Sequence, residues 1–230
     1  MKTSAHGTTP TRLAVLLSGT GRSLANLLRV IEAGELDAAV VAVVSSVAGV
    51  RGLEIAEAAG VPSTVVPRRG FSSDAAYSEA IFTWLEPRRP ELIVLAGFLR
   101  KLVAPPAWEG RILNIHPSLL PETAHYAAGR GLYGERVHAA VLAHGDTTSG
   151  ATVHVVDNGY DTGPVVLRAE APVLPGDTPA SLGTRVFAIE CRLYPEAIRR
   201  HLSRGTKGAS QGDEGGTSTP RPPRPPQSST

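Results

Sequence analysis

Short apolar runs alternate with segments of helical periodicity along most of the chain. Residues 13–17 form a continuous apolar run, and leucine or isoleucine then recurs at positions 24, 27, 28 and 31 before Gly34. The first pattern is typical of a strand buried on both faces, and the second is typical of an amphipathic helix. The same reasoning predicts strands at residues 40–44, 64–66, 91–96, 111–115, 152–156 and 165–171, and helices at residues 53–59, 74–84, 136–143 and 180–201.

This alternation predicts an α/β fold, a doubly wound and mostly parallel sheet with helices on both faces in the Rossmann-like manner. The last two expected strands are too close together for a helical crossover, which indicates an antiparallel addition at one edge of the sheet. Residues 12–203 are expected to form this single domain, after a loose leader at residues 1–11. Residues 204–230 contain only one aliphatic residue, Ala209, and are predicted to be a disordered tail rich in glycine, proline and serine.

Composition narrows the class of protein. Of the 230 residues 42% are hydrophobic, yet no run of about eighteen apolar residues occurs, so no membrane span is expected. With Cys191 as the one cysteine, neither an intramolecular disulfide framework nor a thiolate zinc cluster can form, which favours a reducing, cytoplasmic setting. The formal charge of +2 comes entirely from residues 204–230, so the rest of the chain is neutral and lacks the basic surface that nucleic acid requires.

A glycine-bearing turn joins the first expected strand to the first expected helix. Glycines let backbone N–H groups approach an anion, and the start of a helix adds favourable partial charge. Leu24 stands where a dinucleotide fingerprint has its third glycine, and Ser45-Ser46 stands where an acidic residue would bind the ribose, which argues against a nicotinamide cofactor. The turn is interpreted as a site for a small phosphomonoester, with a glycine turn of purely geometric purpose as the alternative. Its candidate binding residues are Gly19, Thr20, Gly21, Arg22 and Ser23.

Polar side chains close one buried strand at the end where ligands bind in such sheets. Asn114 and His116 alternate with Ile115, so they share one face of the strand while Ile115 points into the core. A carboxamide beside an imidazole can stabilise an oxyanion and move a proton. Asp161 lies in a polar turn between the last two strands. Taken singly, the histidine is more often structural, and Asp161 is an ordinary turn residue.

Several motifs occur together in one order, namely Ser18-Gly19-Thr20-Gly21, Leu95 to Arg100, Asn114 to Pro121, Gly150 to His154, and Asp161-Thr162-Gly163-Pro164. Through these motifs residues 12–202 resemble the folate-dependent formyltransferases, and among them the glycinamide ribonucleotide transformylases of purine synthesis. The resemblance implies transfer of a formyl group from 10-formyltetrahydrofolate, as co-substrate, to the amine of glycinamide ribonucleotide. No metal or covalent enzyme intermediate is expected. The expected partners are these small molecules only, in a monomer or a homodimer.

Carried onto this sequence, the resemblance implies three catalytic residues. Asn114 would donate a hydrogen bond to the developing oxyanion, His116 as imidazolium would pass a proton to the leaving folate nitrogen, and Asp161 would orient the charged ring. The resemblance places the substrate phosphate at the glycine turn and predicts that Glu190 also binds the ribonucleotide. Without the resemblance, Glu190 would be interpreted as a solvated charge on a helix. Folate-binding residues would be Phe98, Leu99, Arg100, Leu102, Val103 and Asn114. Phe98 and Leu99 are equally compatible with ordinary core positions.

Two departures from the family pattern leave the formyl acceptor open. Asp74 stands where some members carry an arginine for the folate glutamate tail, and Arg68, Arg69 or Arg100 would have to compensate. Residues 122–134 are altered and form a longer loop than is usual beside the substrate amine. The alternatives are therefore a formyltetrahydrofolate hydrolase, a formyltransferase acting on another small amine, or a binding module without turnover.

Overall fold

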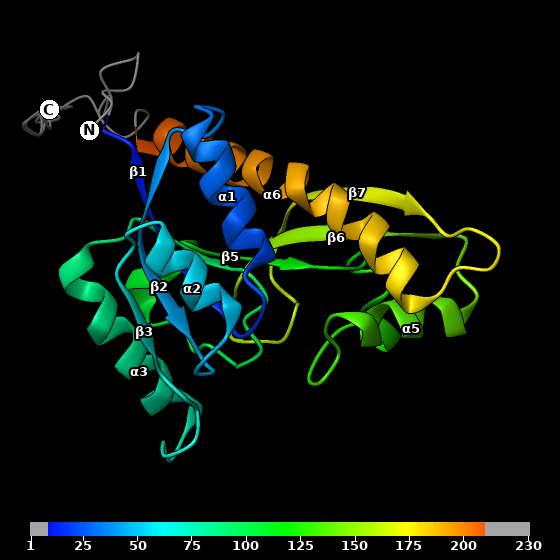
Figure 1. Cartoon of the computed structure of the whole chain (residues 1–230), viewed down its shortest axis with the longest axis horizontal. Coiled ribbons are helices and arrows are strands. Elements are labelled where there is room, and N and C mark those ends of the chain that lie inside the picture. The colour runs from blue at the N-terminus through cyan, green and yellow to red at the C-terminus, as the bar shows by residue number, and fades with distance from the viewer. Residues whose placement is uncertain (1–8, 210–230) are drawn as a thin grey trace, which may run out of the picture.

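A single seven-stranded sheet, in the order β3-β2-β1-β4-β5-β6-β7, forms the centre of the molecule (Figure 1). The structure is a computed structural model that describes residues 9–209, with side chains for residues 9–203. The strands from β3 to β5 are parallel, while β6 and β7 extend the sheet antiparallel. The sheet confirms the predicted α/β fold with an antiparallel addition at one edge. The strands are β1 (Thr11–Leu17), β2 (Ala38–Ser45), β3 (Ser63–Val65), β4 (Leu92–Leu95), β5 (Ile112–His116), β6 (Thr148–Val155) and β7 (Val165–Pro172).

The helices also follow the predicted order, with differences at their boundaries. They are α1 (Arg22–Glu32), α2 (Arg51–Ala58), α3 (Asp74–Leu85), α4 (Ala124–Ala127), α5 (Glu135–His144) and α6 (Pro179–Ala209), with short 3-10 turns η1 (Glu86–Arg88) and η2 (Pro106–Trp108). The backbone of α6 stays helical through Ala209, so the domain boundary predicted at residue 203 falls inside this helix. Thr11 already pairs in β1, which places the start of the sheet inside the predicted leader. Residues 1–8 and 210–230, the rest of the predicted leader and tail, lie outside the described residues.

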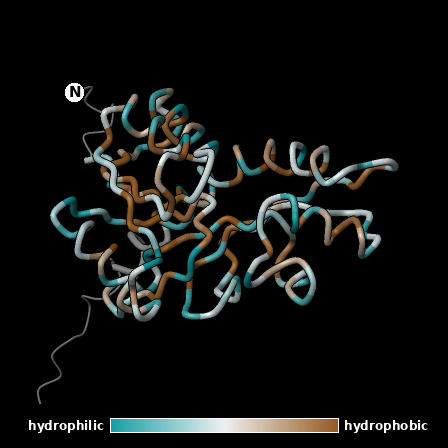
Figure 2. Tube along the Cα trace, turned by 60° about the horizontal axis from the view of Figure 1, so that its bottom comes forward, coloured by the Kyte–Doolittle hydropathy of each residue, from teal (hydrophilic) through white to brown (hydrophobic). Residues whose placement is uncertain are grey.

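Two apolar cores, one on each face of the sheet, hold the helices in place. Leu13, Val15 and Leu17 of β1 face a core that includes side chains of α1, α5 and α6. The alternate residues Ala14 and Leu16 face the opposite core, which is built on α3. This alternation follows from the period of two along a strand. Figure 2 shows hydrophobic residues gathered along the central strands. Among residues 9–209, no helix combines the length and the apolar character needed to cross a membrane.

The long helix α6 carries a proline in its interior, at Pro195. Proline has no N–H, so the carbonyl of Cys191, one turn earlier, loses its usual partner within the helix. The side-chain amide of Asn26, on α1, donates to that carbonyl at 2.7 Å. The gap in the hydrogen-bond ladder of α6 thus becomes a contact between α6 and α1.

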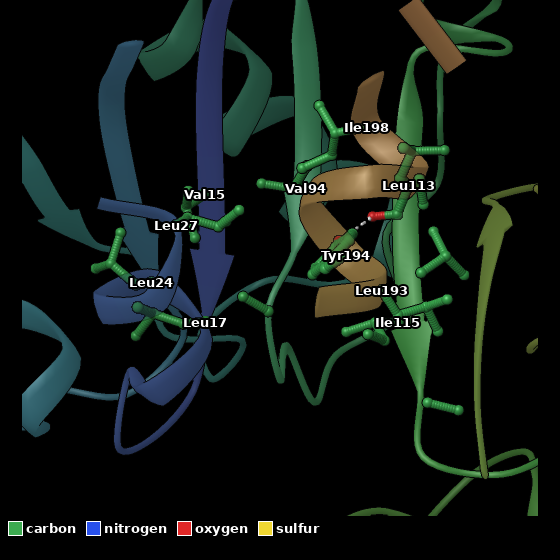
Figure 3. Close-up of a cluster of buried hydrophobic side chains, with 14 of the residues drawn as sticks. Val15, Leu17, Leu24, Leu27, Val94, Leu113, Ile115, Leu193, Tyr194 and Ile198 are labelled. Carbon is green, nitrogen blue, oxygen red and sulfur yellow. Dashed lines mark hydrogen bonds between the residues drawn. The ribbon is translucent and has the colours of Figure 1, made fainter. Parts of the chain in front are cut away.

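Tyr194, next to this proline, joins α6 to the middle of the sheet. Its side chain is buried, and its hydroxyl lies 3.0 Å from the carbonyl oxygens of both Leu95 and Leu113. Figure 3 shows Tyr194 on α6 and its hydrogen bond to Leu113 as a dashed line. Leu95 belongs to β4 and Leu113 to the neighbouring strand β5. The contact therefore fixes both strands at the level where β5 continues into Asn114.

His138, on α5, is buried where that helix packs against α6. A Cβ at Gly183 of α6 would lie 2.9 Å from the His138 ring, so glycine permits the close approach of the two helices. The Nδ1 atom of His138 has no hydrogen-bond partner among residues 9–203. Burial, with smaller electrostatic contributions from His116 and Arg22, lowers the pKa of His138 to about 4. The ring is therefore neutral in the folded protein at pH 7.

Replacing Tyr194 by phenylalanine should destabilise the protein without disturbing its packing. The two buried strand carbonyls would lose the one hydroxyl hydrogen that they share, which costs about 1–3 kcal/mol of unfolding free energy. Urea denaturation measures the change. The matched control is Tyr160→Phe, because Tyr160 is 42% exposed and its hydroxyl makes no hydrogen bond within the described chain. Equal stability of the two variants would show that the Tyr194 hydroxyl contributes nothing.

Acidification should destabilise the fold through His138. Its pKa is near 4 when folded and near 6.5 when unfolded, so the unfolded chain binds more protons between these values, and stability falls as the pH drops through that window. Between pH 7 and pH 5 this histidine lowers the free energy of unfolding by about 2 kcal/mol. Urea denaturation of His138→Gln should show a weaker pH dependence by that amount, whatever its stability at pH 7. An unchanged slope would contradict the argument.

Candidate functional site

A cavity of about 730 Å³ opens at the carboxyl ends of β1, β4 and β5. The connections that follow these strands line it, together with β6, the turn before β7 and one face of α6. It brings together nearly all of the residues that the sequence analysis singled out: Gly19, Thr20, Gly21, Arg22, Ser23, Phe98, Leu99, Arg100, Leu102, Asn114, His116, Asp161 and Glu190. Val103 is the exception. It lies outside the cavity lining, and its backbone N–H donates to the hydroxyl of Ser78 on α3 at 2.9 Å.

The glycine turn forms the start of α1 at one end of the cavity. Gly21 is the N-cap, with φ of 70°, and no side chain caps the helix, so the N–H groups of the first turn are left for another acceptor. A Cβ at Gly21 would lie 2.5 Å from the Cα of Gly52, so the turn also needs glycine for close packing. Gly19 has open space around it. A purely geometric role of the turn therefore explains the glycine at position 21 but not the glycine at position 19.

Arg22 and Glu190 face the same part of the cavity from α1 and α6. The Arg22 guanidinium lies 4.1 Å above the centre of the Phe187 ring, a cation–π contact that holds it against α6. Burial raises the pKa of Glu190 to about 7, while the positive charge of Arg22 opposes this rise. The solvated helical charge considered for Glu190 is thus wrong, because its carboxyl group is half-buried beside a cation in the cavity wall.

Asn114, His116 and Asp161 meet on one side of the cavity. Asn114 donates to Asp161 Oδ1 at 3.2 Å, and His116 Nδ1 lies 3.7 Å from Asp161 Oδ2. Asp161 has a φ of 55°, a left-handed conformation that aspartate tolerates better than most residues. Ile115, between the other two, is buried in the core as expected. The three polar groups that the sequence places far apart therefore form one cluster.

His154 belongs to the same cluster, although no sequence motif predicted a role for it. In the antiparallel register of β5 and β6 it lies opposite Asn114. Its Nε2 is 3.1 Å from Asn114 Nδ2 and 3.5 Å from Asp161 Oδ1, and it is almost fully buried. A histidine within the apolar strand predicted at residues 152–156 is the one signal for it in the sequence. The amide of Asn114 thus has one N–H directed at His154 and the other at Asp161.

The loop after Pro121 supplies two backbone groups to the cluster. His116 Nε2 lies 2.7 Å from the carbonyl oxygen of Ala127, and the N–H of Gly129 donates to Asp161 Oδ2 at 3.0 Å. A carbonyl only accepts, so Nε2 carries the proton of the neutral ring and Nδ1 carries the lone pair. Backbone hydrogen bonds of this kind do not depend on the residue type, so no sequence motif could have predicted them.

Burial and charge act in opposite directions on the two titrating groups. Burial lowers the pKa of His116 below its usual value and outweighs the opposing effects of Asp161 and the Ala127 carbonyl. Burial acts to raise the pKa of Asp161, but the hydrogen bonds and charges of His154, His116 and Gly129 together hold it below its usual value. The resting site therefore contains a carboxylate beside a neutral imidazole. The imidazolium expected from the sequence is not the resting form of His116.

The other end of the cavity combines an apolar wall with basic groups. Phe98 is nearly buried and stacks on Tyr77 with ring centres 6.4 Å apart, so it is both a core residue and part of the wall, whereas Leu99 is 41% exposed. Asp74 forms a 2.7 Å ion pair with Arg68. Its negative charge is therefore compensated within the protein, and Arg100 remains as a further cation in the lining.

Among residues 9–203, no group of three or more histidine, cysteine, aspartate or glutamate side chains is arranged to hold a metal ion.

Comparison with known proteins places the whole domain in one group. The model of the family described as formyl transferase matches residues 11–198. Phosphoribosylglycinamide formyltransferase of Escherichia coli (strain K12) is 35% identical over 190 residues, which cover 81% of this chain and 84% of that protein. The crystal structure of glycinamide ribonucleotide transformylase 1 from Symbiobacterium toebii has a TM-score of 0.77 at 38% identity and covers 86% of this chain and 89% of that one.

Longer relatives contain a similar segment. The trifunctional purine biosynthetic protein adenosine-3 of Drosophila pseudoobscura pseudoobscura is 41% identical over 191 residues, which cover 81% of this chain but only 13% of that protein. The matched family model spans the sheet from β1 to β7 and most of α6, including every strand that contributes to the cavity. The chain therefore belongs to the formyl transferase family.

Proposed function

We propose that the protein transfers the formyl group of 10-formyltetrahydrofolate to the amine of glycinamide ribonucleotide, a step of purine (IMP) biosynthesis. One observation carries the proposal. The uncapped start of α1 at Gly21, which suits a phosphate, and the polar cluster around Asp161 line the same cavity. A hydrolase needs no binding site for a phosphorylated acceptor. The relatives named phosphoribosylglycinamide formyltransferase support the same acceptor.

The two substrates would occupy opposite ends of the cavity. The ribonucleotide phosphate would bind the N–H groups from Gly19 to Ser23 at the start of α1, where the helix dipole favours an anion. The folate would lie along Phe98 and Leu102, with its glutamate carboxylates toward Arg100 and Arg68. This orientation brings the amine and the formyl group together beside Asn114, His116 and Asp161.

Formyl folate supplies a carbonyl carbon that an amine can attack. His116 Nδ1, which carries the lone pair of the neutral ring, would take the proton released by the attacking amine and pass it to the departing folate nitrogen. Asp161, at 3.7 Å from Nδ1, would stabilise the positive charge on the ring during that interval. The imidazolium predicted from the sequence thus forms during turnover, so the lowered pKa of His116 suits a base that becomes an acid.

Asn114 would stabilise the negative charge that develops on the formyl oxygen. Its N–H toward His154 holds the amide in place, and the N–H now directed at Asp161 is the one available to the oxygen. When Asp161 turns its charge to the protonated His116, that N–H is released at the moment it is needed. The carboxylate of Asp161 would thus link two events, the protonation of His116 and the release of the Asn114 N–H to the oxyanion.

Removal of the Asn114 amide should abolish most of the formyl transfer. We expect Asn114→Ala to lower kcat about a hundredfold or more, because an oxyanion donor acts mainly in the transition state. Spectrophotometric conversion of 10-formyltetrahydrofolate, with and without glycinamide ribonucleotide, measures the rate, and His116→Ala serves as a second inactive variant. Loss of the formyl donor without ribonucleotide, still dependent on His116, would instead support a hydrolase. Full activity of Asn114→Ala would contradict the mechanism.

Loss of the Glu190 charge should weaken ribonucleotide binding selectively. The carboxylate would accept hydrogen bonds from substrate hydroxyl groups, so Glu190→Gln should raise the KM for glycinamide ribonucleotide about tenfold and leave the KM for the folate unchanged. Because its pKa is about 7, the difference from the wild-type protein should be larger at pH 8 than at pH 6. Glu196→Gln is the control, since Glu196 lies on the same helix but pairs with Arg199 and Arg200. A KM that rises equally in both variants would exclude the role of Glu190.

A further inference from the structure

The unusual loop at residues 122–134 makes its hydrogen bonds to the reacting groups through its backbone, and residues 129–134 of the loop also line the cavity. The Ala127 carbonyl contacts His116 Nε2, and the Gly129 N–H contacts Asp161 Oδ2. These two groups decide which nitrogen of His116 carries the proton and where the Asp161 carboxylate stands. Their own positions depend on whatever fixes the loop between them and the rest of the fold.

The only helix in this loop, α4, is four residues long. A single helical turn has no stability of its own in water, so tertiary contacts must hold it. The methyl group of Ala127 is fully buried in the core against α5. A methyl group fixes depth in a core but offers little resistance to rotation or sliding of the turn. Thr123 anchors the start of the turn by hydrogen bonds with Ser118 and Leu119, so a directional contact is needed at its other end to fix the Ala127 carbonyl.

Tyr126, next to Ala127, provides that contact. Its hydroxyl donates to Asp146 Oδ2, and its ring stacks on His144 with centres 4.0 Å apart and planes 10° apart. His144 Nδ1 in turn lies 2.9 Å from Asp146 Oδ1. His144 ends α5 and Asp146 follows it. Tyr126, His144 and Asp146, here called the Tyr126 brace, thus fasten α4 to the far end of α5.

We propose that Tyr126 is a positioning residue for the reaction, because the Tyr126 brace fixes the Ala127 carbonyl and the Gly129 N–H against His116 and Asp161. The proposal rests on the proposed function in so far as His116 and Asp161 are the reacting groups. Tyr126 itself does not line the cavity. Residues 129–134 of the same loop line the cavity but lie beyond the Tyr126 brace, so we expect the main effect on turnover.

Tyr126→Phe tests the proposal, since it removes the hydroxyl and keeps the ring that stacks on His144. We expect kcat to fall about tenfold, as small misplacements of reacting groups do, with the KM for both substrates nearly unchanged. The Ala127 carbonyl raises the pKa of His116, so its loosening should also move the His116 limb of the kcat–pH profile to lower pH. Glu122→Gln is the matched control, because it breaks an exposed ion pair of the same loop with Arg168.

A measurement independent of turnover separates this proposal from the proposed function. Nitrogen-15 NMR of the His116 ring should show the Nε2–H form in the wild-type protein and in Glu122→Gln, and a mixture of both neutral forms in Tyr126→Phe. If the wild-type protein proves inactive in formyl transfer, the proposed function fails while the NMR comparison still decides the role of Tyr126.

Asp146→Asn covers the case in which Tyr126→Phe does not fold. It keeps an acceptor for the tyrosine but removes the charge, so it should shift the His116 ring and kcat in the same direction by a smaller amount. If the variants lower only the unfolding temperature and leave kcat, the pH profile and the His116 ring as in the wild-type protein, Tyr126 is merely structural and the proposal is overturned.

Discussion

The site depends on one buried negative charge, that of Asp161. A carboxylate removed from water is costly unless polar groups surround it. Here the Asn114 amide on β5 and the Gly129 N–H in the loop after α4 donate to it, and the ring nitrogens His116 Nδ1 and His154 Nε2 lie 3.7 and 3.5 Å away. Satisfying this charge therefore determines how the antiparallel edge and the loop meet the parallel sheet. The same groups give the site its chemistry. When the carboxylate turns from Asn114 to His116, the Asn114 N–H becomes free and the His116 ring is the one that carries the charge.

Packing in the parallel part of the sheet positions the strands and helices that surround that charge. Tyr194 ties the ends of β4 and β5 together from α6, and Asn26 joins α6 to α1 at the carbonyl that Pro195 leaves unpaired. One helix thus braces the strand that carries Asn114 and the helix whose start would receive the phosphate. Glu190 lies one turn before Tyr194 on the same helix. The distance between the two halves of the cavity is set by packing of rigid elements and not by the loops that line it.

Much of this could be predicted from the sequence, and the limits are instructive. The apolar runs predict the strands because parallel strands are buried on both faces, and the ends of those strands place Asn114 and His116 at the cavity. Helical periodicity alone places Glu190 on the surface, because it does not reveal that this residue and Arg22 of α1 line the same cavity. Val103 looked like a wall residue because a motif gives the order of residues and not the direction in which the backbone turns. The roles of Ala127 and Gly129 were invisible, since any residue has a carbonyl and almost any has an N–H.

The position of α6 at the end of the described chain has a consequence for synthesis. The ribosome releases β1 to β7 before the helix that carries Glu190 and Tyr194, so the emerging chain holds a sheet whose central strands lack their clamp and whose cavity lacks one wall. A ligand that recognises the complete cavity cannot be held until this last helix has docked. Docking of α6 on the seven-stranded sheet is therefore the step that completes the cavity.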